Sequence, residues 1–67
     1  MEFKLEDDYI ELIKLLKVMD LCPTGGMAKH LIEEGRVFVD GEVELRKRRK
    51  IRPGMIVKLN GQEITIL

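Results

Sequence analysis

A chain of 67 residues can form one small domain, residues 1–67, and such a domain has little room for an enzyme cleft. Its composition, 45% hydrophobic and 36% charged, is typical of a folded domain and not of a disordered one. The net charge of zero hides an asymmetry. Residues 1–45 carry eleven acidic and five basic side chains, whereas residues 46–67 carry one acidic and seven basic ones.

The sequence contains no sign of secretion or membrane insertion. Cys22 is the single cysteine and cannot form an internal disulfide, and the opening residues "MEFKLEDD" are acidic, unlike a signal peptide. Charged side chains interrupt the longest apolar stretch, residues 9–21, at Glu11, Lys14, Lys17 and Asp20. We therefore expect a cytoplasmic domain.

The first elements are a short strand and a helix. Phe3 and Leu5 alternate with charged residues, which predicts a short strand or an extended arm. Asp8 and Glu11 have the spacing of a capping box and precede apolar residues at helical spacing, so we expect a helix from about Tyr9 to Met19.

A second helix is expected after Pro23, which prevents the first helix from continuing. Thr24 can cap its start, and Gly35 is well placed to end it. Its apolar residues fall on one face: Met27, Ala28, Leu31 and Ile32.

Two hairpins are predicted in the second half of the chain. Asp40-Gly41 follows the alternating "VFV", and Asn60-Gly61 lies between segments 56–59 and 63–66. Between the hairpins, "RKRRKIRPG" reads as a basic loop or ragged strand that ends at a Pro53-Gly54 turn. Because helices and strands are segregated, we predict an α+β fold with two helices packed on a small antiparallel sheet of about four to five strands.

The residues available for catalysis are few. There is no serine, and the single Cys22 and the single His30 lie eight residues apart, which disfavours nucleophilic catalysis. One cysteine and one histidine also make a poor metal site. "TGGMAK" lacks the spacing of nucleotide-binding glycine loops. We therefore expect no enzyme activity, no cofactor and no metal.

The glycine pair at the start of the second helix has two interpretations. A helix N-terminus presents unpaired N–H groups, and a nucleic-acid phosphate can approach them closely where Gly25 and Gly26 lack β-carbons. The alternative is tight packing of this helix start against the first helix. Lys29 points from the same side as Gly25, and Arg36 follows the helix.

The basic run from Arg46 to Arg52 places six cations in seven residues. Because these charges repel one another, a folded domain that keeps such a run usually binds an external polyanion with it. With Phe3, Tyr9 and Phe38 as the only aromatic residues, stacking platforms for unpaired bases are scarce. Recognition of the backbone shape of a structured RNA is then favoured.

From Ile10 to Leu59 the chain resembles the S-four RNA-binding domain, through "LLKVMDLCPTGGMAKHLIEEGRVFVDGEVELRKRRKIRPGMIV". Bacterial tyrosyl-tRNA synthetases, pseudouridine synthases and a ribosome-recycling heat-shock protein share this domain. The length and the segments "TGGMAK" and "RKRRKI" look most like its small standalone bacterial members, the YaaA/YbcJ-like family. The resemblance implies the S-four/αL-type RNA-binding fold.

The resemblance also implies an RNA site on the second helix and the basic residues. Matched residue by residue, this site contains Thr24, Gly25, Gly26, Lys29, His30, Arg36, Arg46, Lys47, Arg48, Arg49, Lys50 and Arg52. Many family members have arginines where this chain has Gly25 and Gly26, which leaves backbone contacts at these positions. Two further departures, Asp40 for the usual asparagine and Met55 for the usual acidic residue, concern turn geometry.

The expected function is that of a non-catalytic, monomeric protein that recognises structured RNA, either rRNA or tRNA. Ribosome assembly or translation is the expected setting, with a ribosomal or other protein as a second partner. The alternative is a protein-interaction adaptor whose basic patch binds an acidic protein partner.

Overall fold

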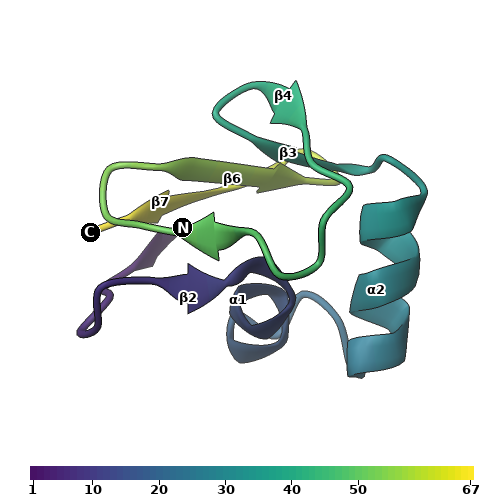
Figure 1. Cartoon of the computed structure of the whole chain (residues 1–67), viewed down its shortest axis with the longest axis horizontal. Coiled ribbons are helices and arrows are strands. Elements are labelled where there is room, and N and C mark those ends of the chain that lie inside the picture. Colours follow the sequence, from purple (N-terminus) through teal and green to yellow (C-terminus); the bar gives the residue numbers. More distant parts are fainter.

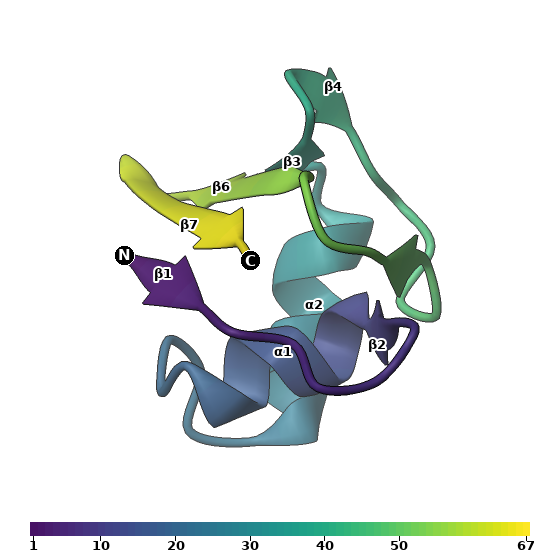
Figure 2. The same cartoon turned by 90° about the vertical axis from the view of Figure 1, so that its left-hand side faces the viewer.

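Two helices cover one face of a five-stranded sheet, and a short two-stranded sheet lies beside them (Figures 1 and 2). The computed structural model describes all residues, 1–67. In chain order the elements are β1 (Glu2–Phe3), β2 (Ile10–Glu11), α1 (Leu12–Val18), α2 (Gly25–Glu33), β3 (Val37–Val39), β4 (Glu42–Val43), β5 (Lys50–Ile51), β6 (Ile56–Leu59) and β7 (Gln62–Ile66). The predicted α+β fold with two helices on a sheet is confirmed.

The larger sheet has the strand order β1-β7-β6-β3-β4 and is mixed. Its four later strands pair antiparallel, as predicted. The first strand, however, pairs parallel to β7, with Glu2 opposite Thr65 and Phe3 opposite Ile66. The first residues of the chain thus pair with its last residues along the outer edge of β7. This pairing places the two chain ends close together (Figure 2). No local sequence pattern predicts such a pairing of the two chain ends.

The hydrophobic core lies between the larger sheet and the helices. Strands β3, β6 and β7 alternate buried and more exposed residues, as expected when one face packs and the other meets water. The core contains thirteen buried residues: Leu12, Leu15, Leu16, Cys22, Ala28, Ile32, Val37, Val39, Ile51, Val57, Leu59, Ile64 and Ile66. Neither helix is long and apolar enough to cross a membrane.

Both predicted hairpins are present and use the same turn geometry. Asp40 and Gly41 have φ values of 51° and 85°, and Asn60 and Gly61 have values of 51° and 80°, as type I′ turns require. Asp40 has a further role, because its Oδ1 accepts a 2.9 Å hydrogen bond from the Ile56 amide. The aspartate therefore ties one hairpin to the neighbouring strand.

The predicted ends of α2 are also confirmed. The Thr24 side chain caps the helix by accepting a 3.1 Å hydrogen bond from the Met27 amide. At the other end Gly35 has a φ of 78°, and its amide donates to the Ile32 carbonyl oxygen. Together with the bond from the Arg36 amide to the Leu31 carbonyl oxygen, this forms a Schellman motif.

Helix α1 begins later than predicted, at Leu12 instead of about Tyr9, and it ends at Val18. The two residues before it form β2 and pair with β5. The expected capping box is absent, because Glu11 occupies the N-cap position without a side-chain hydrogen bond. The first amides of α1 are bonded instead to carbonyl oxygens of the loop that joins β4 to β5.

Candidate nucleic-acid interface

The loop from β4 to β5, residues 44–49, contains four of the twelve Lys and Arg residues of the chain and is called the basic loop below. Its backbone is fixed against the start of α1. The Leu12 amide donates to the Arg49 carbonyl oxygen at 2.9 Å, and the Ile13 amide donates to the Lys47 carbonyl oxygen at 3.0 Å. Unpaired amides of a helix start and carbonyls of a loop thereby satisfy one another. A turn closed by the Arg49 amide and the Arg46 carbonyl oxygen, 3.2 Å apart, brings Lys47 and Arg48 to the tip.

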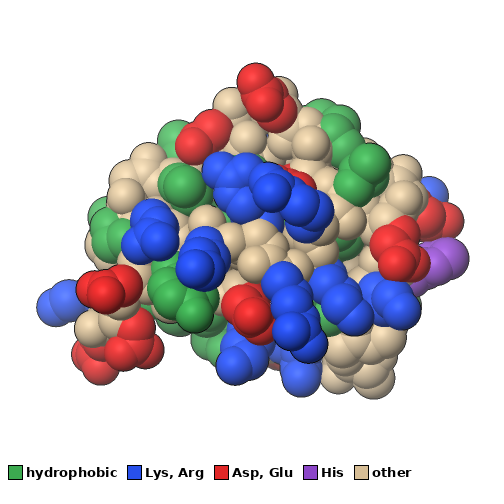
Figure 3. All heavy atoms as spheres, viewed as in Figure 1, with side chains coloured by type: hydrophobic (Ala, Val, Ile, Leu, Met, Phe, Trp, Pro, Cys, Tyr) green, Lys and Arg blue, Asp and Glu red, His purple; other side chains and the backbone are tan.

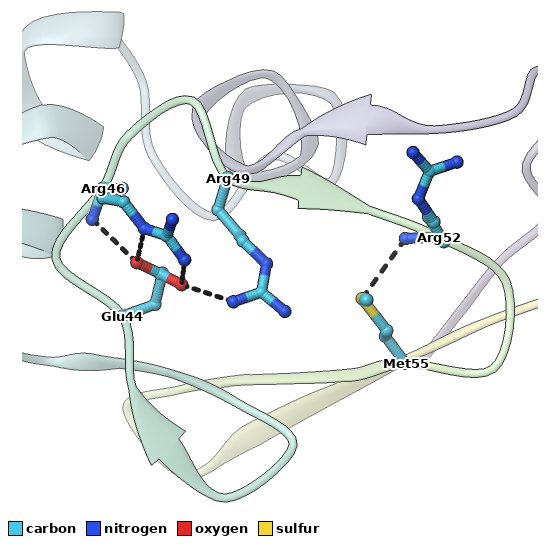
Figure 4. Close-up of polar contacts among 5 residues, drawn as sticks. All are labelled: Glu44, Arg46, Arg49, Arg52 and Met55. Carbon is cyan, nitrogen blue, oxygen red and sulfur yellow. Dashed lines mark hydrogen bonds and ion pairs between the residues drawn. The ribbon is translucent and has the colours of Figure 1, made fainter.

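Glu44 is the only buried charged residue, with 6% of its surface exposed. Its carboxylate accepts hydrogen bonds from the Arg46 amide at 3.0 Å, from Arg46 Nε at 3.0 Å and from Arg46 Nη2 at 3.2 Å. Arg49 Nη1 donates to Oε1 of the same carboxylate at 2.8 Å, the oxygen that also accepts the bond from Arg46 Nη2. Figure 4 shows both guanidinium groups turned toward Glu44, whereas the Arg52 side chain points away from it. Glu44 was not predicted as a functional residue, because the sequence around it is typical of an ordinary hairpin strand.

These contacts lower the pKa of Glu44 from 4.5 to about 2. The side-chain hydrogen bonds from Arg46 are the largest cause, and burial opposes them. The same pairing raises the pKa of Arg46. Glu44 is therefore ionised at neutral pH, and its charge stabilises two of the six cations that follow it.

A basic depression of about 720 Å³ lies over the basic loop and β5. It is lined by Arg46, Lys47, Arg48, Arg49, Lys50, Arg52 and Met55. Figure 3 shows Lys and Arg side chains gathered across this face of the molecule. No carboxylate forms an ion pair with Lys47, Arg48, Lys50 or Arg52. The fold thus brings the predicted basic residues together and leaves four of them free to meet an external anion.

No other part of the chain packs tightly against the two glycines at the start of α2. A β-carbon on Gly25 would approach the Lys17 side chain no closer than 3.7 Å, and one on Gly26 would meet only Thr24 Oγ1, at 3.9 Å. Both are ordinary contact distances, so packing against α1 does not require these glycines. Their amides have no acceptor in the chain, as expected for the first helical residues.

The remaining predicted site residues, which lie on α2 and just after it, differ in whether a carboxylate pairs with them. His30 Nε2 lies 3.1 Å from Glu34, and Arg36 Nε lies 3.2 Å from the same carboxylate. Lys29 is exposed and has no ion-pair partner. Lys29 is therefore the one unpaired cation of α2, whereas His30 and Arg36 share a carboxylate at the surface.

The basic depression and the start of α2 do not touch, because α1 lies between them. The first amides of α1 bond to the basic loop, and Lys17 near its other end lies beside Gly25. Lys17 thus adds positive charge to the start of α2. Lys14 and Lys17 were not predicted as site residues, although their spacing of three residues places them on neighbouring parts of an exposed helix face.

The single cysteine lies in the core, and no cluster of potential metal ligands is present. Cys22 is a core residue with 2% of its surface exposed, and burial raises the pKa of its thiol. A reactive cysteine needs the opposite, an accessible thiolate of lowered pKa. No three His, Cys, Asp or Glu side chains lie together as metal ligands.

The S4 domain family model matches residues 3–67, and the chain belongs to this family. The predicted resemblance to the S-four domain is thereby confirmed.

Relatives with known sequences and structures agree with this assignment. The chain is 42% identical over 59 residues to the "Putative RNA-binding protein YbcJ" of Escherichia coli K12, covering 88% of this chain and 84% of the relative. It is 35% identical over 57 residues to the "Probable ribosome maturation protein RlbA" of Bacillus subtilis, covering 85% and 80%. The solution structure of E. coli YbcJ, described as revealing an alfaL motif involved in RNA-binding, superposes with a TM-score of 0.75 at 40% identity. That match covers 98% of this chain and 85% of the YbcJ chain.

Proposed function

We propose that this protein binds structured RNA, either rRNA or tRNA, without catalysing a reaction, and acts in ribosome assembly or translation. The observation that carries the proposal is the basic depression, in which four cations without carboxylate partners are held on a fixed backbone. Arg and Lys contacts to phosphates supply affinity for nucleic acid without reading its sequence.

The fixed loop favours an RNA of defined shape. Its carbonyls are bonded to α1, and the Glu44 carboxylate holds the side chains of Arg46 and Arg49. Cations at fixed separations suit phosphates at fixed separations, such as those of a folded RNA helix. The names of the E. coli and B. subtilis relatives support an RNA partner and a role in ribosome maturation.

The start of α2 is the second part of the proposed surface. The free amides of Gly25 and Gly26 suit a phosphate oxygen, and Lys17 and Lys29 add positive charge nearby. In this proposal one RNA crosses α1 and contacts both the basic depression and the start of α2. Arg36 and His30, which share Glu34, lie at the margin of the contact.

A salt titration tests the proposal. Affinity for a short RNA hairpin is measured at several salt concentrations for the wild type, for the double variant Lys47→Ala/Arg48→Ala, and for Lys58→Ala, which removes an exposed cation of β6. We expect the double variant to lower the slope of log affinity against log salt by roughly 1 to 2, whereas Lys58→Ala leaves it unchanged. Affinity that is independent of salt, or equal losses in both variants, would contradict the proposal.

The RNA itself is identified by crosslinking the protein to RNA in cells and sequencing the attached fragments. We expect rRNA or tRNA fragments to be enriched over those recovered with the Lys47→Ala/Arg48→Ala variant. Enrichment of messenger RNA alone would overturn the ribosomal role. A bound protein that survives nuclease treatment and the double substitution would favour the adaptor alternative.

A further inference from the structure

Tyr9 lies directly before β2, beside two cations of the basic depression. Its side chain is partly open to solvent, with 40% of the residue exposed. Lys50 Nζ lies 5.0 Å from the centre of the Tyr9 ring, and Arg52 Cζ lies 5.7 Å from it. Both distances are typical of cation–π contacts.

The pairing of β2 with β5 fixes this arrangement. Ile10 lies opposite Ile51 and Glu11 opposite Lys50, so Tyr9 and Arg52 flank the same end of this two-residue antiparallel ladder. Side chains alternate along each strand, and Ile51 is completely buried. Tyr9, Lys50 and Arg52 therefore lie on the outer face of this small sheet.

A further contact restrains the position of Arg52. Its Nη1 donates a 3.4 Å hydrogen bond to the Asp8 carbonyl oxygen, in the residue just before Tyr9. Arg52 is thus anchored to the backbone beside Tyr9, close to the aromatic ring. Tyr9 also lines a second depression formed by residues 3–11 and Lys14, so it stands at the border between that depression and the basic one.

We propose that Tyr9, Lys50 and Arg52 form a site for one unpaired nucleotide, whose base stacks on the exposed tyrosine ring while the two cations contact its phosphates. The proposal rests on the proposed RNA-binding function and makes it more specific: the preferred RNA has an unpaired nucleotide next to a helix. Stacking on an aromatic ring accepts any base, because every base has a π-face. One ring suffices for one nucleotide, which agrees with the expectation that stacking platforms for unpaired bases are scarce and places one of them at Tyr9.

Two RNA probes and two variants test this site. The probes are a short blunt-ended RNA duplex and the same duplex with an unpaired adenosine overhang. The variants are Tyr9→Leu, which keeps a large apolar side chain, and Tyr9→Phe, which keeps the ring. We expect Tyr9→Leu to lose at least about fivefold in affinity for the overhang RNA. The blunt duplex should bind equally well to both variants and to the wild type, and Tyr9→Phe should retain the preference for the overhang.

The fluorescence of the wild-type protein gives an independent measurement, because the chain contains one tyrosine and no tryptophan. We expect the overhang RNA to quench this emission more strongly than the blunt duplex does. If Tyr9→Leu weakens both RNAs equally, or neither, Tyr9 is not a nucleotide site and the inference is overturned. If Lys47→Ala/Arg48→Ala also leaves the affinity for the blunt duplex unchanged, the proposed function itself fails.

Discussion

Arg49 Nη1 lies 2.8 Å from Glu44 Oε1, and this ion pair joins the two ends of the basic loop. Glu44 follows β4 directly, and Arg49 directly precedes β5. Because the pair closes the loop, Lys47 and Arg48 are displayed at a fixed turn between its ends. A buried carboxylate therefore organises a surface whose other charges are positive.

Replacement of Glu44 by glutamine should destabilise the protein. The amide keeps the shape of the side chain but loses the charge that holds Arg46 and Arg49. We expect a loss of about 1–3 kcal/mol in the free energy of unfolding, as for hydrogen bonds to a charged, buried group. Urea unfolding measures it, and Glu42→Gln on the exposed neighbouring strand serves as the control. Equal stability of the two variants would show that the carboxylate does not hold the loop.

The same carboxylate predicts a dependence of stability on pH. Its pKa is about 2 in the folded protein and near 4.5 when unfolded, so the unfolded state takes up a proton first as the pH falls. The contribution of Glu44 is complete above about pH 5 and is lost as the pH falls toward 2. The difference in stability between the wild type and Glu44→Gln should shrink over this range. A constant difference would contradict the lowered pKa.

Gly26→Ala should separate stability from RNA binding. A β-carbon fits at this position, and alanine favours a helix by up to about 1 kcal/mol over glycine, so we expect a higher melting temperature. If an RNA phosphate approaches the amides of Gly25 and Gly26, the same methyl group should weaken RNA binding. Unchanged affinity in the stabilised variant would remove the start of α2 from the proposed surface.

Lys17→Ala tests a residue that sequence reasoning missed. Lys17 is exposed and lies beside Gly25, so it can add a phosphate contact at the start of α2. We expect its removal to lower the salt slope of RNA binding by about 0.7–0.9, with no change in melting temperature. Lys4→Ala, which removes an exposed cation after β1, is the matched control. Similar slopes for the two variants would indicate that Lys17 adds only diffuse charge.

Thr24→Ala should remove the cap of α2. The Met27 amide would lose its acceptor, and we expect the free energy of unfolding to fall by about 1 kcal/mol. Thr24→Ser retains the hydroxyl and should keep most of this stability. Guanidinium denaturation of the three proteins measures the difference, and equal losses in Ala and Ser would argue against capping through the hydroxyl.

Features that depend on local chemistry were predictable from the sequence. Asp40-Gly41 and Asn60-Gly61 specify their turns because these residues tolerate positive φ, and Thr24 and Gly35 mark the ends of α2. The six cations of the basic depression were predicted as a group, since all belong to one short segment, whereas Met55 was not predicted to line it. Their contacts with RNA remain predictions.

Features that depend on distant partners were not predictable. Asp8 and Glu11 have the spacing of a capping box, yet the carbonyls of Lys47 and Arg49 satisfy the first amides of α1 in its place. The parallel pairing of β1 with β7 joins residues more than sixty positions apart. The role of Glu44 depends on the ion pair with Arg49 across the loop, and the position of Tyr9 depends on the pairing of β2 with β5. Neither contact can be inferred from the neighbouring sequence.

The bonds from the Leu12 and Ile13 amides to the basic loop also have a thermodynamic consequence. A loop rich in like charges that was free in solution would lose conformational entropy whenever it bound a ligand, by about 1–2 kcal/mol for each residue fixed. Here the loop backbone is ordered when the protein folds, so this entropy is not lost again when a ligand binds. Association should therefore proceed without a slow rearrangement, and hydrogen exchange at Leu12 and Ile13 should already be slow in the free protein.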